Sequence, residues 1–520
     1  MHHRWTRWAF RFAGLLSLAW FLIRVTPKPS RAAYPCQRAA APLAGGFLVW
    51  MAGLLGSAAL YRRGKHLWRH SRLGPAFVCL TAAVLLVVGA LVTGPQPAAR
   101  ADVTPNQPIG VGKGVFPGRV VWAHDAGATT WEGPGHGHWW QSSYTSQEAV
   151  DRMMSTAVHR LSGQSNDAKS WDAMIRNFNR THGNGDKGYK RGEKVVVKVN
   201  LVGCIIGGGG VDPASHELVR QLDYMNTSPQ MIVALLRQLV KGAGVREEDI
   251  SVGDPLSLFP NQYYDYCHRE FPGVHYLDHD GGDAAHPRTR VTFSQVPFYW
   301  SARPADKTPD YVPAPYAEAK YLVNMANLKA HASAGVTLCA KNHYGSLFRK
   351  PPQKGYFDMH GSLPREIKTP GHYRALVDLM GHAHIGGKTL VCFIDGLYPG
   401  VHPVETSPRR FASAPFNGHW AASLFASQDQ VAIDSVGFDF LYAEWEDYPR
   451  MAGADDYLHE AALANNPPSG TFYDPDHPDS RTRLASLGVH EHWNNPRARQ
   501  YSRNLGRREG IELVGVETGR

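Results

Sequence analysis

The first hundred residues contain no aspartate and no glutamate, although they contain thirteen lysines and arginines. The whole chain has 520 residues, with 55 lysines and arginines against 45 aspartates and glutamates, so its net charge of +10 comes from this first segment. The remainder carries a small net negative charge and lacks the basic surface that binding to a phosphate backbone requires. The sequence therefore predicts that nucleic acid is not a partner.

Cysteine is also scarce. The chain has 6 cysteines, and no two of them have the C-x-x-C spacing. Iron–sulfur clusters and zinc ribbons need such closely spaced thiolates, so no iron–sulfur cluster is expected. Four cysteines follow residue 101, and we expect them to be buried thiols: Cys204, Cys267, Cys339 and Cys392.

Histidine, in contrast, is abundant. The chain has 26 histidines but no H-E-x-x-H motif, the pattern of zinc proteases. There are three His-x-His pairs: His136 with His138, His382 with His384, and His490 with His492. On a strand both rings of such a pair face one side, as in many metal chelates, whereas elsewhere a structural role is more common. A divalent metal is thus a candidate cofactor, and the cofactor remains unknown.

Three apolar stretches occur in the first hundred residues: Phe12–Ile23, Gly45–Tyr61 and Pro75–Thr93. The second and third are each long enough to cross roughly 30 Å of hydrocarbon, and the first crosses only if its flanking arginines snorkel. Five lysines and arginines between the second and third stretches should keep that loop cytoplasmic. The third stretch would then carry all later residues out of the cytoplasm.

Residues 1–101 are therefore predicted to be a membrane-anchor region with two or three transmembrane segments. Ala99-Arg100-Ala101 also resembles a signal-peptidase site, but we expect an uncut anchor because two apolar stretches precede it. The expected location is the cell membrane, with the large C-terminal domain on the extracytoplasmic side.

The fold class is indicated by residues 190–520, which follow an extension rich in Gly, Trp and His at 102–189. Lys194–Val199 is a β-branched run typical of a buried strand. Ser228 and Pro229 can cap a helix, and Asp249–Gly253 predicts the next strand. Strand, helix and strand form a βαβ unit, which implies a parallel sheet.

Other elements follow the same patterns. Helices are expected to begin near Ser146 and at Ser170, and to occupy His372–His382 and Gln430–Tyr442; strands are expected at Tyr321–Met325, Thr389–Ile394, Ala422–Ala426 and Ile511–Val516. Residues 263–313 resemble an insertion, because Arg290–Phe298 alternates like a hairpin strand. The predicted fold class is α/β: a mostly parallel sheet flanked by helices, with an inserted partly antiparallel region and preceded by N-terminal transmembrane helices.

Polar residues lie at or beyond the ends of four predicted strands. They are Asn200, Asp254, Asp395 and, after the third strand, Asn327, Lys329 and His331. Asn and Asp at a single strand end commonly just form turns. Four strands together favour a shared pocket, because ligands of open parallel sheets bind beyond the carboxyl ends of the strands.

The densest group of candidates is residues 327–346, where polar side chains surround Ala334-Gly335-Val336 and a segment that could be helical from Val336 to Ala340. A lysine here could be a Schiff-base nucleophile, an anion clamp or a snorkelling surface residue. A histidine could be a base, a metal ligand or a hydrogen-bonded core residue. We assign catalysis to Lys341, His331 and His343; binding of substrate or cofactor to Lys198, Asn200, Asn327, Lys329 and Asn342; and metal binding to Asp254 and Asp395.

Several motifs in order resemble the family called domain of unknown function 362, over about residues 190–516. They are Val195–Leu201 (VVVKVNL), Val252-Gly253-Asp254, Asn327–His331 (NLKAH), Gly335-Val336-Thr337, Lys341–Gly345 (KNHYG), Ser427–Asp434 (SQDQVAID) and Gly488–Trp493 (GVHEHW). The resemblance implies no settled activity. Many members carry a ferredoxin-like cysteine cluster, which this chain lacks, and that weakens a role in electron transfer.

A shorter segment resembles the nickel-pincer lactate racemases. His331, Ala334-Gly335 and Lys341 keep the intervals of the segment that anchors the cofactor in that family. The resemblance implies that Lys341 would hold the pincer nucleotide covalently and that His331 would lie by the active site. The interval to His360, which would match a nickel-ligating histidine, differs.

The sequence thus predicts a membrane-anchored, extracytoplasmic enzyme, metal- or cofactor-assisted, that acts on a small anionic or hydroxylated substrate. Two alternatives stay open: a nickel-pincer-type isomerase of hydroxy acids, and a non-catalytic binding or redox accessory protein. The expected partners are the membrane and a small-molecule ligand. Replacing Lys341 by Ala distinguishes an enzyme from a non-catalytic protein, since an enzyme would keep its melting temperature and lose ligand binding.

Overall fold

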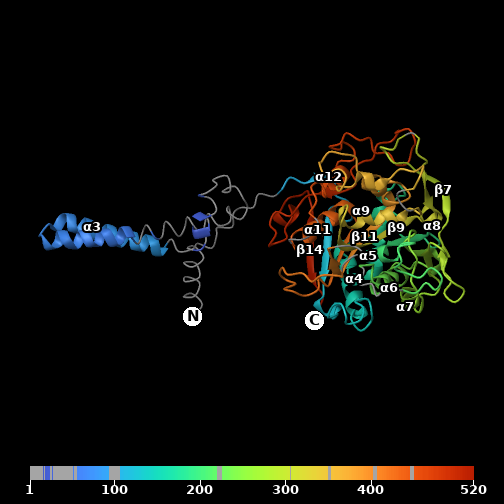
Figure 1. Ribbon diagram of the computed structural model, residues 1–520, viewed down its shortest axis with the longest axis horizontal. Coiled ribbons are helices and arrows are strands. Elements are labelled where there is room, and N and C mark those ends of the chain that lie inside the picture. The colour runs from blue at the N-terminus through green and yellow to red at the C-terminus, as the bar shows by residue number, and fades with distance from the viewer. Residues whose placement is uncertain are drawn as a thin grey trace. The chain divides into compact units, whose positions relative to one another are not determined.

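The computed structural model in Figure 1 describes residues 16, 18–20, 22–23, 26, 51, 55–92, 106–218, 225–304, 306–349, 353–401, 407–445 and 450–519. The chain forms two compact units, Met1–Val103 and Thr104–Arg520.

In the first unit, α3 (Leu73–Val92) covers most of the third apolar stretch. Most of the first two stretches lies outside the described residues. Among the residues that are described, no helix has both the length and the apolar character needed to cross a membrane.

The second unit is built around a ten-stranded sheet with the order β14-β2-β12-β11-β9-β3-β4-β5-β6, and β10 pairs with β9 beside this path. Its strands are β2 (Arg119–His124), β3 (Val195–Val199), β4 (Ile250–Gly253), β5 (His275–Asp278), β6 (Thr289–Arg290), β9 (Tyr321–His331), β10 (Gly335–Thr337), β11 (Thr389–Gly400), β12 (Ser423–Ser427) and β14 (Glu512–Glu517). The strands from β11 to β6 run parallel, and β12 is antiparallel to both of its neighbours. The predicted mostly parallel sheet is confirmed.

Helices cover both faces of this sheet (Figure 1). One face carries α4 (Gln147–Ser162), α5 (Asp167–Thr181), α6 (Pro229–Arg237) and α7 (Asn261–His268); the other carries α8 (Ala314–Glu318), α9 (Cys339–Asn342), α10 (Ala375–Gly381), α11 (Gln430–Tyr442) and α12 (Asp456–Ala462). The two cores explain the valine run in β3, since Val195 and Val197 pack into one core and Val196 into the other.

Helix starts follow the capping residues. Ser146 and Ser228 accept hydrogen bonds from the amides of Ala149 and Met231, as the sequence predicts for α4 and α6. The expectation for α5 was wrong: this helix begins at Asp167 because Asn166, rather than a residue near Ser170, caps it.

Two further expectations need correction. β9 continues to His331, so Asn327 and Lys329 lie within the strand rather than after it. Residues 336–340 are not one helix, because β10 folds back antiparallel onto the end of β9 before α9 begins. Residues 263–313, predicted as a partly antiparallel insertion, contain both kinds of pairing: β7 (Phe293–Phe298) and β8 (Asp310–Pro313) form a separate antiparallel ribbon, whereas β5 and β6 extend the main sheet in parallel.

Smaller features complete the unit. β1 (Ile109–Gly110) pairs with β13 (Val489–His490). β14, at the position of the strand predicted for Ile511–Val516, lies at the sheet edge. The four cysteines of this unit are buried free thiols, which confirms that expectation.

Candidate functional site

A cavity of about 300 Å³ opens at the carboxyl edge of the parallel strands. Asn200 follows β3, Asp254 follows β4, and His331 ends β9, so three neighbouring strands lead into it. The cavity is lined by Asn200, Val202, Ile205, Asp254, Leu256, His331, Thr337, Lys341, Asn342, Tyr344, Gly345 and His360. The shared pocket expected at this edge is therefore present. Five of the ten residues assigned from sequence line it, among them the predicted metal ligand Asp254. Asp395, the other predicted metal ligand, lies elsewhere.

Lys341 lines this cavity. It is mostly buried, and its Nζ lies 3.7 Å from the centroid of the Tyr344 ring. Among the described residues, no carboxylate or carbonyl oxygen forms an ion pair or hydrogen bond with its amine. Burial, together with the nearby charge of Lys198, lowers the pKa of Lys341 to about 7. A large share of this amine is therefore unprotonated at neutral pH.

Two histidines face the same cavity. The Nδ1 atom of His331 accepts hydrogen bonds from the amides of Ser333 and Ala334, at 3.0 and 3.1 Å. A neutral imidazole that accepts at Nδ1 carries its proton on Nε2, so His331 is set up as a donor through Nε2. His360 lies edge-on to Tyr344, with ring centroids 5.2 Å apart. Burial and then the charge of Lys341 lower the pKa of His360 to about 4, which keeps this ring neutral.

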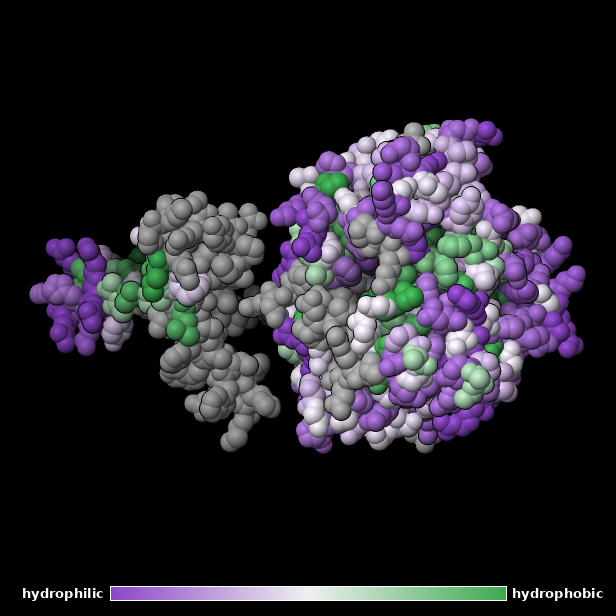
Figure 2. All heavy atoms as spheres, turned by 45° about the vertical axis from the view of Figure 1, so that its right-hand side comes forward, coloured by the Kyte–Doolittle hydropathy of each residue, from purple (hydrophilic) through white to green (hydrophobic). Residues whose placement is uncertain are grey.

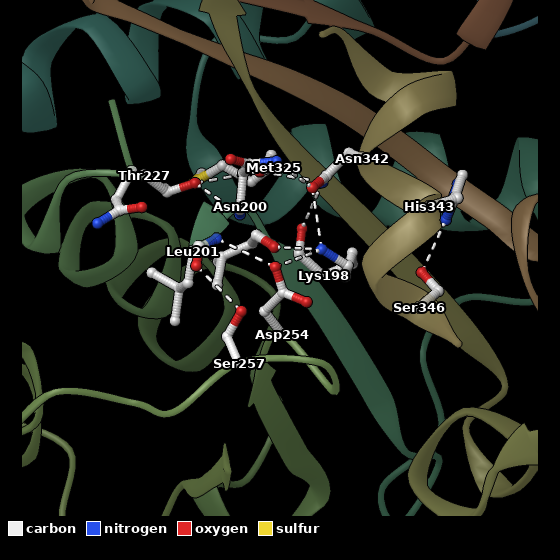
Figure 3. A network of polar contacts seen from close by, with 12 residues as sticks. Lys198, Asn200, Leu201, Thr227, Asp254, Ser257, Met325, Asn342, His343 and Ser346 are labelled. Carbon is white, nitrogen blue, oxygen red and sulfur yellow. Dashed lines mark hydrogen bonds and ion pairs between the residues drawn. The ribbon is translucent and has the colours of Figure 1, made fainter. Parts of the chain in front are cut away.

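Beneath the cavity, Lys198 forms the centre of a buried polar network (Figure 3). Its ammonium donates to Val199 O at 2.6 Å and Asn342 Oδ1 at 2.9 Å, and pairs with Asp254 Oδ2 at 3.0 Å. An ammonium has three protons, so these three acceptors saturate it. Lys198 supports the cavity from below and does not line it.

The network extends through amide side chains. Asn200 donates from Nδ2 to Asn342 Oδ1 at 3.0 Å and accepts from Lys329 Nζ at 2.6 Å. Lys329 also donates to the carbonyl of Met225, and burial lowers its pKa well below the usual value. Lys329 is therefore held inside the protein. Asn327, which accepts from the Thr227 hydroxyl at 3.0 Å, belongs to the same buried layer.

His343, the third predicted catalytic residue, is fully buried and does not line the cavity. Its Nε2 lies 2.9 Å from Nδ2 of Asn324, and its Nδ1 lies 3.1 Å from the Ser346 hydroxyl (Figure 3). Burial lowers its pKa to about 3. Both ring nitrogens are thus occupied by neighbours, an arrangement suited to fixing the turn that carries Lys341.

The two predicted metal ligands lie at different places. Asp254 lines the cavity and also accepts from the Leu201 amide at 3.1 Å, whereas Asp395 accepts from the amides of Ser228 and Leu397. Burial raises the pKa of Asp395. Within the described ranges, no group of three or more His, Cys, Asp or Glu side chains is placed to hold a metal ion.

Sequence reasoning did not select several residues of this site. Tyr344 and Gly345 adjoin Lys341 in the KNHYG motif, but nothing in the motif shows which of its members face a cavity. Gly345 has a steric role: a Cβ there would lie 2.3 Å from Asp254 Oδ1, so only glycine lets the two segments meet. The Gly-rich loop Gly203–Gly210 contributes Ile205 to an apolar part of the wall.

One comparison with known proteins matches this part of the chain. The family model described as "Domain of unknown function (DUF362)" matches residues 195–439. A comparison with curated proteins finds no match, and the likeness to the nickel-pincer lactate racemases is not shown. The matched segment runs from β3 into α11 and includes every lining residue of the Lys341 cavity. Residues 195–439 are therefore similar to the DUF362 family.

Proposed function

We propose that this protein is a membrane-anchored, extracytoplasmic enzyme that acts on a small anionic or hydroxylated substrate in the Lys341 cavity. The observation that carries the proposal is the amine of Lys341: it faces a cavity, has no acidic partner among the described residues, and has a pKa of about 7. Lysines with lowered pKa values in enclosed sites are typical nucleophiles and bases.

The chemistry that fits this amine best is attack on a carbonyl carbon. The Nζ lone pair forms the new C–N bond, the carbonyl oxygen takes up protons and leaves as water, and an iminium on Lys341 remains. His331 can donate from Nε2 to that oxygen, since its Nδ1 is occupied by two backbone amides. A pKa near 7 instead of 10.5 increases the free-amine fraction at neutral pH on the order of a thousandfold.

Reductive trapping tests this proposal. The full chain is incubated with propanal and cyanoborohydride, which reduces an iminium to a stable secondary amine, and the modified lysine is located by peptide mass spectrometry. Lys341 should be modified first, with half-maximal rate near pH 7. Lys388 is the internal control: burial lowers its pKa to about 8, but its ammonium donates to the carbonyls of Tyr316 and Ala319.

Two variants complete the test. Lys341→Arg should abolish the fast modification while the protein keeps its melting temperature, and Lys169→Arg, a change at an exposed helix lysine, should leave the rate unchanged. Modification of Lys341 no faster than of the exposed lysines would overturn the enzymatic proposal and favour a non-catalytic binding or redox accessory protein.

The membrane anchor is part of the same proposal. It is supported by the absence of acidic residues from the first hundred positions and by the five basic residues between the second and third apolar stretches. Apolar side chains in the described helices of the first unit are also exposed, among them Leu55 at 66% and Phe77 at 69%, and some hydrophobic surface of this unit is visible in Figure 2. Fractionation of cells, followed by protease treatment from outside, tests it: residues 104–520 should sediment with membranes and be accessible.

A further inference from the structure

A second and larger cavity, of about 690 Å³, lies at the opposite edge of the sheet. Thr389 and Leu390, the first residues of β11, form part of its wall, whereas the Lys341 cavity lies where the parallel strands end. The two cavities share no lining residue. The remaining walls come from residues 111–117, residues 177–182 at the end of α5, residues 381–387, Gln428, Gln430, Asn465 and residues 485–487. The volume is within the range of small-molecule sites, roughly 300–1,000 Å³.

The wall of this cavity has a basic side chain but no acidic one. No aspartate or glutamate is among its lining residues, and Lys113 is its one lysine or arginine. The Lys113 side chain is exposed, and within the part of the chain that the structure describes no hydrogen bond or ion pair holds its ammonium. The nearest acid, Asp429, is buried and receives backbone amides, including that of Lys113 at 2.8 Å. Burial lowers the pKa of Lys113 and the charge of Asp429, beneath the loop, raises it, while no carboxylate stands on the cavity wall itself.

The loop that carries Lys113 is held in place. The amide of Val111 donates to Ser486 Oγ at 2.9 Å, and that of Val115 to Gln428 Oε1 at 3.1 Å. Gly114 has a φ of +107°, and a Cβ there would lie 3.0 Å from the Cβ of Gln428, so the loop packs closely against its support. The backbone from which the Lys113 side chain extends is therefore fixed before any ligand arrives.

The rest of the wall combines apolar surface with one unpaired polar atom. The apolar residues are Val111, Pro117, Phe178, Leu390 and Leu487, of which Val111 is 64% exposed. The hydroxyl of Thr389 is buried and has no hydrogen-bond partner in the described ranges. A buried hydroxyl without a partner is costly, and a ligand atom that bonds to it removes that cost.

We propose that this cavity binds a small amphiphilic anion, with an aliphatic body against the apolar wall and a carboxylate or phosphate group paired with Lys113. Thr389 Oγ1 supplies a further hydrogen bond to the polar part of the ligand. Such a site needs both halves of the ligand, because an exposed lysine binds a free anion only weakly and the apolar wall alone does not select charge. The site is independent of the reaction proposed for Lys341.

Calorimetric titration of the full chain in lipid nanodiscs tests the proposal, with hexanoate, hexyl phosphate, hexan-1-ol and acetate as ligands. Hexanoate or hexyl phosphate should bind at least tenfold more tightly than both hexan-1-ol and acetate, and the ratio between the two anions identifies the preferred head group. Equal binding of hexanoate, hexyl phosphate and hexan-1-ol, or no binding of either anion, would overturn the proposal.

Variants connect the binding to this cavity. Lys113→Gln should weaken binding of the preferred anion at least tenfold, Lys113→Arg should change it less than threefold, and Thr389→Val should weaken it about threefold to tenfold. Lys169→Gln is the matched control for loss of one exposed positive charge and should have no effect. Binding that Lys113→Gln leaves unchanged would place the anion elsewhere and refute the assignment.

Discussion

The two edges of the sheet use lysine in opposite ways. At the carboxyl edge, Lys198 and Lys329 are fully buried and held by side-chain and backbone oxygens, and Lys341 alone faces the cavity. At the amino edge, Lys113 is exposed on a loop that is fixed through its backbone. Burial lowers the pKa of both Lys341 and Lys113, but the charge of Lys198 adds to the shift at Lys341, whereas the carboxylate of Asp429 opposes it at Lys113. The first edge therefore favours a neutral amine, and the carboxylate below the second edge favours the charged form.

Among the changes that test this contrast, Asp254→Ala is expected to have the largest effect. The change removes the carboxylate that pairs with Lys198 and leaves a buried ammonium without its counter-charge. The free energy of unfolding should fall by about 3–5 kcal/mol, measured by urea denaturation. A loss below 1 kcal/mol would show that the carboxyl edge does not depend on its charge pair.

A smaller loss is expected from Gly345→Ala. The new methyl group would meet Asp254 Oδ1, and that carboxylate cannot turn away without losing Lys198 and the Leu201 amide. We expect a destabilisation of about 1–3 kcal/mol. Gly355→Ala is an informative comparison. A Cβ at Gly355 would have no atom within 4 Å, but the residue has a φ of +88°. The destabilisation by this change would therefore come from backbone strain alone.

The stability of the Lys341 edge should depend on pH. Because the folded pKa of about 7 lies below the ordinary value of 10.5, the folded state binds fewer protons than the unfolded state between these values. The wild type should therefore gain stability relative to Lys341→Met as the pH rises from 7 to 10.5, by on the order of 1 kcal/mol after allowance for partial exposure. Parallel curves for the two proteins across this range would contradict the lowered pKa.

The smallest effect is expected at the amino edge. Lys113→Gln removes an exposed charge whose ammonium forms no hydrogen bond or ion pair with the described residues, so the free energy of unfolding should change by less than about 0.5 kcal/mol. The same denaturation series measures it. A loss comparable to that of Asp254→Ala would mean that Lys113 is a structural residue, and the contrast between the two edges would disappear.

The carboxyl-edge site could be predicted from sequence to a large extent, because it depends on regular geometry. Parallel strands end at a common edge, so residues that follow β3 and β4 must lie near the end of β9. The sequence could not separate lining residues from supporting ones. Lys198, Lys341 and His343 are all polar residues in the sequence, and only their packing in the fold shows that Lys341 faces the cavity and the other two do not.

The amino-edge cavity could not be predicted. Its walls come from residues 111–117, 381–390 and 485–487, which carry no shared motif and meet only through tertiary packing. The turn from β9 into β10 escaped prediction for a related reason: its three-residue strand depends on pairing with a longer neighbour rather than on its own propensity.

The saturation of Lys198 has a consequence for the life of this protein in a medium of variable composition. An ammonium whose three protons are all bonded to acceptors of its own chain is part of the polypeptide. Unlike a bound metal ion, it cannot dissociate, exchange with the solvent or be removed by a chelator. The electrostatic environment of the neighbouring amine is then a property of the folded polypeptide itself, because burial lowers the pKa of Lys198 and the carboxylate of Asp254 opposes that shift.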